Sequence, residues 1–248
     1  LWTVAEAEAA IDGRGYLTLA AAVEAAVEGE TVTLLKSVTG AGLVINKSIA
    51  IDFNEKIYTV NKAVGSTGTA SNGFQILKEN NVTLMNGTLN VAAASASKFY
   101  TIIQNYANLT VENMNLDGTN LDKWSTTDGD SYVLSINSGN VYIKGETNIT
   151  ANNDGDKAFA FDACDKSGWG YDLPVVKVYT TGKIAGGIEN SATIELYSGT
   201  YTIDVNEWCA EYHVSVKNDN DTWTVESRYI DELAILDDGK YTYDFVND

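Results

Sequence analysis

Short segments in which apolar and polar residues alternate recur along the chain, and each ends in a turn residue and a second apolar pair. Five such segments span residues 80–91, 108–118, 140–150, 175–186 and 192–203. Alternation with a period of two residues is typical of a strand that buries one face. The first apolar pairs of the five segments are Val82 and Leu84, Leu109 and Val111, Val141 and Ile143, Val176 and Val178, and Ile194 and Leu196.

A glycine or asparagine follows each of these pairs, and such residues tolerate the positive φ angle of a tight corner. The predicted corner residues are Gly87, Asn113, Gly145, Gly182 and Gly199. Further apolar pairs precede the segments, for example Phe74 and Ile76, or Phe159 and Phe161. Each repeat is therefore expected to contain about three short strands.

The repeats start roughly 18 to 35 residues apart, within the period range of solenoid proteins. The sequence thus predicts an all-β fold, a parallel β-helix, because only stacked repeats can bury all their apolar faces together. In that fold Val82, Leu109, Val141, Val176 and Ile194 should stack as equivalent inward positions.

A helix is expected near residues 18–28, before the first repeat. Thr18 suits the N-cap, Leu19, Val23 and Val27 share one face at helical spacing, and Gly29 suits the C-terminal end. With that face turned inward, the helix would cover the N-terminal end of the core.

Three stretches carry a resemblance to a known family: residues 18–38, 42–60 and 205–225. Together with the repeats, they resemble the pectate-lyase-like right-handed β-helix superfamily, in particular the modules of secreted surface proteins of gut bacteria and their phages. The resemblance implies an N-terminal segment with a capping helix over residues 1–30. A right-handed β-helix over residues 31–205 and a strand-rich C-terminal cap and tail over residues 206–248 would follow. It also implies an extracellular location, on a bacterial cell surface or a virion surface.

The net charge of −18 argues against nucleic acid and anionic lipid as partners, because both are themselves negative. No apolar stretch approaches the roughly 20 residues of a membrane span, so membrane insertion is not expected. The chain begins at Leu1 without a signal-like apolar segment, which suggests a mature or excised form whose targeting segment is absent.

Catalytic residues are not expected, and neither is a cofactor. The only histidine is His213, and the only arginines, Arg14 and Arg228, lie outside the repeats. The resemblance implies that a lyase would need arginine or lysine as its base; Lys144 or Lys177 could serve, although both occupy ordinary outward strand positions. The hydrolase motifs of the superfamily are missing.

No metal site is predicted either. The acidic turns at residues 128–130, 153–156 and 218–221 lack EF-hand spacing, and Asp, Asn and Gly are residues that turns need in any case. Cys164 and Cys209 are compatible with two buried thiols or with one disulfide bridge.

Two polar insertions interrupt the repeats, at residues 117–131 and 165–174. Loops inserted in solenoids tend to form binding faces, and aromatic rings beside polar groups suit sugars or peptides. The alternative is that the rings pack back onto the flank of the coils. The predicted ligand-binding residues are Trp124, Trp169, Tyr171, Asp130 and Asp172.

Residues 209–226 are expected to form a strand pair around an Asn/Asp turn, which would cover the last repeat. Tyr241, Tyr243 and Phe245 alternate in a further strand that could pair within the chain or with a neighbouring copy, giving a homo-oligomer.

The function expected is that of a non-enzymatic, extracellular surface-display or adhesin-like module whose partner is a glycan or a host-surface protein. A virion structural protein, such as a capsid fibre or tailspike-like subunit, is the first alternative. A divergent polysaccharide lyase or hydrolase is the second.

Overall fold

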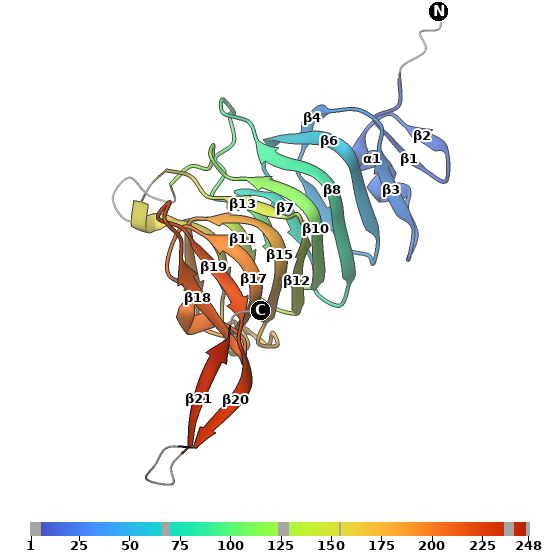
Figure 1. Ribbon diagram of the computed structural model, residues 1–248. Helices are drawn as coiled ribbons and strands as arrows, with labels where there is room; N and C mark the ends of the chain where they lie inside the picture. The colour runs from blue at the N-terminus through green and yellow to red at the C-terminus, as the bar shows by residue number, and fades with distance from the viewer. Residues whose placement is uncertain (1–5, 66–69, 124–128, 154, 236–240, 247–248) are drawn as a thin grey trace, which may run out of the picture.

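Two long stacks of strands form the body of the protein, and a separate hairpin projects from its C-terminal end (Figure 1). The computed structural model describes residues 6–65, 70–123, 129–153, 155–235 and 241–246. No helix in this part of the chain has the length and apolar composition needed to cross a lipid bilayer.

The larger stack, sheet A, follows a path of eleven strands and is mixed. In spatial order its strands are β18 (His213–Lys217), β19 (Trp223–Ser227), β17 (Thr193–Tyr201), β15 (Val175–Ala185), β12 (Asn140–Gly145), β10 (Asn108–Asp117), β8 (Asn81–Val91), β6 (Ala50–Lys62), β3 (Thr31–Leu34), β1 (Ala9–Ile11) and β2 (Arg14–Tyr16). Two short strands join this path from the side: β13 (Asn148–Thr150) pairs with β10 and β15, and β4 (Val38–Ala41) pairs with β6.

The smaller stack, sheet B, is parallel throughout. Its strands, in spatial order, are β16 (Gly187–Asn190), β14 (Ala158–Ala163), β11 (Ser131–Ile136), β9 (Thr101–Asn105), β7 (Asn72–Ile76) and β5 (Leu43–Ile45). The remaining elements are the helix α1 (Leu19–Ala25), the 3-10 turns η1 (Gly155–Lys157), η2 (Ser167–Trp169) and η3 (Asn206–Trp208), and the hairpin strands β20 (Tyr229–Ile235) and β21 (Tyr241–Val246).

From β5 to β17 the chain alternates between sheet B and sheet A, and strands of successive repeats pair in parallel. The arrangement is solenoid-like, and the predicted all-β class with parallel strands is confirmed. The antiparallel exceptions in sheet A lie at its two ends, where β1 and β2 and then β18 and β19 add to the stack.

The predicted inward stack is also confirmed. Leu109 pairs in register with Val82 on one side and Val141 on the other, and the row continues through Val176 to Ile194. All five side chains are buried. Removing an aliphatic side chain of this size from water contributes roughly 1.5–3 kcal/mol, so the row is a main source of stability for each repeat.

The predicted corners need two corrections. In the first segment the positive φ lies at Asn86 (58°), one residue before Gly87. Gly87 is required for space instead, because a Cβ atom there would lie 2.4 Å from the Cβ atom of Phe53. Gly182 does not have a positive φ, whereas Asn113, Gly145 and Gly199 do.

The number of strands per repeat also differs from the prediction of about three. In β8, β10, β15 and β17 the two apolar pairs of a segment belong to one strand that bends at the corner, so each repeat gives one long strand to sheet A and one to sheet B. The strand is interrupted in the repeat that contains β12 and β13, and also in the first repeat, where β3 and β4 both pair with β6.

Helix α1 begins as predicted and ends early. The Thr18 hydroxyl accepts a hydrogen bond from the Ala21 N–H at 3.1 Å, and Leu19 and Val23 are buried. The prediction that Val27 turns inward is wrong: the helix ends at Ala25, and Val27 is 62% exposed. At this end the Lys47 ammonium donates to the carbonyl of Glu24 in the last turn and to that of the C-cap Ala26, and Gly29 lies beyond both.

The N-terminal cap is shared between this helix and a strand pair that the alternation pattern did not reveal. β1 pairs antiparallel with β3, and β2 with β1, so the two strands cover the edge of sheet A while α1 packs against them.

The C-terminal cap agrees with the prediction. β18 and β19 pair antiparallel around the turn at residues 218–222, and β19 pairs with the end of β17. β20 and β21 pair with each other as a two-stranded sheet, which is the intrachain pairing. Cys164 and Cys209 are free thiols, so the disulfide alternative is wrong.

The cap formed by α1 can be tested with a pair of charge substitutions. Val23→Asp places a carboxylate in the buried face of α1 and should destabilise the protein by roughly 3–5 kcal/mol, because the charge has no partner there. Val27→Asp, on the exposed side, should change the free energy of unfolding by less than about 0.5 kcal/mol. Chemical denaturation followed by circular dichroism measures both changes. Equal changes in the two variants would contradict a capping role for α1.

Candidate binding site

A groove of about 360 Å³ runs over the outward face of sheet B. Its floor comes from a row of outward positions that the parallel register brings side by side. The row is Gln104, Ser135, Asp162 and Glu189, and Gln75 continues it beyond the groove. Each of these residues follows an inward apolar residue such as Leu134 or Phe161, so the alternation that buries the core also builds the floor.

Asp162 is a buried carboxyl group in this floor. It accepts hydrogen bonds from the Ile136 N–H and from the Ser135 hydroxyl, the latter at 3.2 Å. Burial raises the pKa of Asp162 from 3.8 to about 7, because the carboxylate loses its hydration, and the two hydrogen bonds offset this only in part. The neighbouring Glu189 raises this pKa further, whereas Lys166 lowers it.

Tyr132 places its hydroxyl group between two carboxylates of the groove. Its Oη atom lies 2.6 Å from Glu189 Oε2 and 3.4 Å from Asp130 Oδ2, so its single proton is donated to Glu189. Burial and this hydrogen bond raise the pKa of Tyr132 and keep the hydroxyl protonated. The ring stacks on Phe159 with a centroid distance of 5.2 Å, which fixes its direction.

Trp169 forms an exposed aromatic wall of the groove. It lies in η2, and 76% of its surface is accessible. The Lys166 ammonium lies 5.2 Å from the centroid of its ring, a cation–π contact. The ring therefore does not pack down onto the flank of the coils, and its surface is available to a ligand.

The predicted site residues fall into three groups. Asp130 and Trp169 line the groove together, although they come from different insertions. Tyr171 and Asp172 line a neighbouring hollow of about 240 Å³, which shares Tyr106 with the groove. Trp124 lies outside the described residues.

Tyr171 fits the packing alternative better than Trp169 does. It is half-buried, and its ring lies 4.9 Å from that of Tyr106. Asp172 is exposed, and its backbone carbonyl accepts a hydrogen bond from Ser138.

Sequence reasoning missed Tyr132, Asp162 and Glu189. Asp162 follows Phe161, one of the apolar residues used to predict the repeats, so an alignment of the repeats against one another could have placed it in a polar row. The hydrogen bond between Tyr132 and Glu189 spans 57 residues, and no local pattern signals it.

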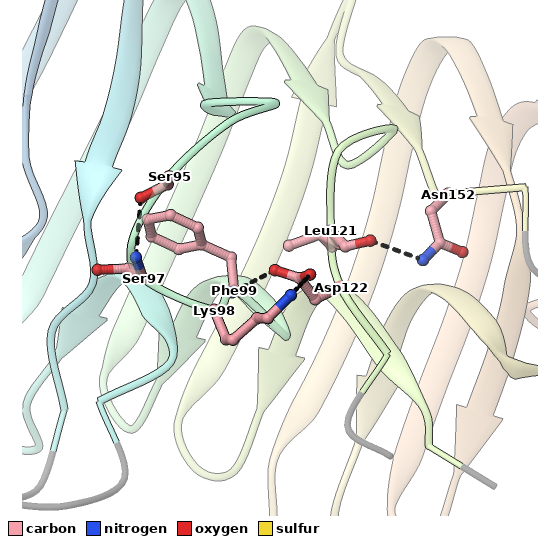
Figure 2. Close-up of polar contacts among 7 residues, drawn as sticks. All are labelled: Ser95, Ser97, Lys98, Phe99, Leu121, Asp122 and Asn152. Atoms are coloured by element: carbon pink, nitrogen blue, oxygen red, sulfur yellow. Dashed lines mark hydrogen bonds and ion pairs between the residues drawn. The ribbon is translucent and has the colours of Figure 1, made fainter. Parts of the chain in front are cut away.

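A set of contacts fixes the start of the insertion at residues 117–131 to neighbouring loops (Figure 2). Asp122 forms an ion pair with Lys98 at 2.7 Å and accepts the Phe99 N–H at 3.0 Å, while its own N–H donates to the Phe99 carbonyl. Asn152, from the loop of the following repeat, donates to the Leu121 carbonyl at 3.2 Å. Three successive loops are thus linked, and the start of the insertion is fixed to the scaffold.

A larger hollow of about 560 Å³ lies at the corner of sheet A, but its side chains have a structural task. Asn113 donates to Asn86 at 3.3 Å, Asn86 donates to Asp52 at 3.2 Å, and the Glu146 N–H donates to Asn113. These amides hold successive corners together, and the hollow is lined by no aromatic ring. The groove on sheet B is therefore the better candidate for ligand binding.

Neither metal-ligand clusters nor comparisons with known proteins assign a function to the groove. In the described part of the chain, no group of three or more His, Cys, Asp or Glu side chains could hold a metal ion. Comparisons with protein-family models, curated proteins and solved structures found no match for this chain.

The buried carboxyl group makes a prediction for stability against pH. Because the folded-state pKa of Asp162 is raised, the folded protein holds a proton between pH 4 and 7 that the unfolded chain releases, so stability should fall as pH rises through this window. The side chain at this position in the Asp162→Asn variant cannot ionise. Between pH 4 and pH 8 the free energy of unfolding of the variant should therefore fall by roughly 2–4 kcal/mol less than that of the wild type. Thermal melting at the two pH values measures this difference.

The exposed Asp172→Asn variant is the control for that experiment and should keep the wild-type pH profile. If stability changed with pH in the same way in the wild type and in Asp162→Asn, Asp162 would not be the group responsible for the fall.

Proposed function

We propose that the protein is a non-enzymatic glycan-binding module. It is displayed outside the cell, on a bacterial or virion surface, and it binds its ligand in the groove on sheet B. In this proposal the solenoid-like body is a right-handed parallel β-helix of the pectate-lyase-like kind. It serves as a rigid spacer that carries the groove.

The exposed ring of Trp169 carries the proposal. An aromatic ring covers the apolar face of a sugar, and neighbouring polar groups satisfy its hydroxyls. In the groove Gln104, Ser135 and Glu189 supply such groups at fixed positions along the floor. A groove that is open to solvent and walled by an aromatic ring suits a chain of sugars.

The histidine and the lysines that could act as the base of a lyase lie outside the groove or are already engaged, which disfavours lyase-type catalysis there. His213 lies on β18, where its ring packs edge-on against Tyr197 with a centroid distance of 5.3 Å, and it does not line the groove. Lys177 forms an ion pair with Glu195 at 2.8 Å, and the Lys144 ammonium lies 5.3 Å from the centroid of the Tyr142 ring. Both lysines are on sheet A. The lysine that lines the groove, Lys166, is engaged with Trp169.

A subunit of a larger assembly, such as a virion fibre, is a second candidate, and the hairpin β20–β21 favours it. The hairpin forms its own sheet and projects from the body (Figure 1). A two-stranded hairpin is marginally stable alone in water. Pairing with the hairpin of a second copy would stabilise it and produce a homo-oligomer.

The binding proposal predicts that Trp169→Ala lowers glycan affinity at least tenfold, because an exposed aromatic anchor at the centre of a contact contributes about 1.4 kcal/mol or more. A glycan array identifies the ligand, and calorimetry measures the affinity. Tyr212→Ala removes a ring of similar exposure, 61%, that does not line the groove, and should bind as the wild type does.

Trp124→Ala tests the other predicted ring in the same assay. Equal affinity of Trp169→Ala and the wild type, with circular dichroism unchanged, would argue against the groove as the binding site.

The assembly candidate predicts a change of mass in solution. Light scattering after size exclusion should give an oligomer for the full chain and a monomer for a chain that ends at Arg228, since the hairpin is then absent. A monomer in both cases would leave the hairpin without an assembly role.

A further inference from the structure

The groove on sheet B is negatively charged. Three carboxyl groups line it, those of Asp130, Asp162 and Glu189, and one ammonium group does, that of Lys166. The Lys157 ammonium beside the groove pairs with Asp130, but the whole chain has a net charge of −18. A ligand that enters the groove therefore meets a negative field close to an aromatic wall.

Glu189 differs from its neighbours in lacking a cationic partner. Asp130 has the Lys157 ammonium 3.4 Å from its Oδ1 atom, and Asp162 is buried beneath hydrogen-bond donors. Glu189 is exposed and accepts only the Tyr132 hydroxyl; in the part of the chain that the structure describes, no ammonium or guanidinium group lies within ion-pair distance of it.

The position of Glu189 is nevertheless well defined. Its Oε2 atom is held by Tyr132 at 2.6 Å, and Tyr132 is in turn fixed by stacking on Phe159. A carboxylate that is oriented and exposed in a groove, but not neutralised, is suited to accept a charge-assisted hydrogen bond from a ligand.

We infer that the groove selects glycans that carry a free primary amino group, with the ligand ammonium bound by Glu189 and the sugar ring stacked on Trp169. This inference rests on the proposed glycan-binding function and adds the class of sugar. Neutral sugars would gain only the stacking and the hydroxyl contacts. Uronic acids would place a second negative charge beside Asp130 and Glu189 and should be disfavoured.

Three trisaccharides of matched length test the selection by calorimetry: the trimers of glucosamine, of N-acetylglucosamine and of galacturonic acid. The wild type should bind the glucosamine trimer about tenfold more tightly than the N-acetylated trimer, because a hydrogen bond to a charged group has about that effect on affinity. Glu189→Gln keeps the shape and the hydrogen bond from Tyr132, and should remove the tenfold preference.

Two controls separate the groove from general attraction of a cation to an acidic protein. Glu112→Gln removes one negative charge from sheet A and should leave the preference unchanged. Trp169→Ala should weaken binding of the glucosamine and N-acetylglucosamine trimers alike. Raising the salt concentration should reduce the preference in the wild type and have no such effect in Glu189→Gln, since screening acts on the ion pair.

The possible outcomes are distinct. Equal binding of the amino and N-acetylated trimers, with both weakened by Trp169→Ala, would overturn the amine selection and leave the glycan-binding groove in place. Tighter binding of the galacturonate trimer would also overturn the selection. Binding of the glucosamine trimer that neither Glu189→Gln nor Trp169→Ala alters would overturn the selection and the proposed site together.

Discussion

Each strand in the middle of this protein satisfies its backbone hydrogen bonds only through the repeat before it and the repeat after it. The parallel ladders of sheets A and B therefore impose a register on every repeat, and this register places chemically similar side chains in rows. Inward rows such as Leu109 between Val82 and Val141 form the core. A slip of one residue would exchange the inward and outward faces of a strand, which burial of these rows forbids.

The same constraint explains the two ends of the body. The first and last parallel strands would each leave a row of backbone donors and acceptors unpaired. β1 and β2 cover one end and β19 with β18 covers the other, both by antiparallel pairing. The mixed character of sheet A thus follows from closing a stack that is otherwise parallel.

Rows of outward-facing side chains on sheet B form the floor of the candidate site. Tyr132 and Glu189 are 57 residues apart in the chain and share a hydrogen bond of 2.6 Å, because β11, β14 and β16 lie side by side in register. Loops between the sheets then add groups that the rows lack, namely Asp130 and the Trp169 ring. Contacts of Asp122 with Lys98 and Phe99 fix the start of the first insertion to the preceding loop.

The sequence by itself determined the features that depend on local periodicity. Local residue order was sufficient to predict the parallel strands of the repeats, the inward row from Val82 to Ile194, the N-cap of α1 at Thr18 and the insertion that carries Trp169, because each is set along one segment.

Only the tertiary structure decided the features that depend on which repeat lies beside which. Lys47 donates to carbonyls at the end of α1, Phe53 limits the space at Gly87, and the raised pKa of Asp162 arises from its burial against β11. Because the repeats differ in length, the register between their strands cannot be predicted from the sequence alone. The residues of the groove come from different repeats, and only the register between repeats brings them together and buries them. The groove is therefore a property of the tertiary structure.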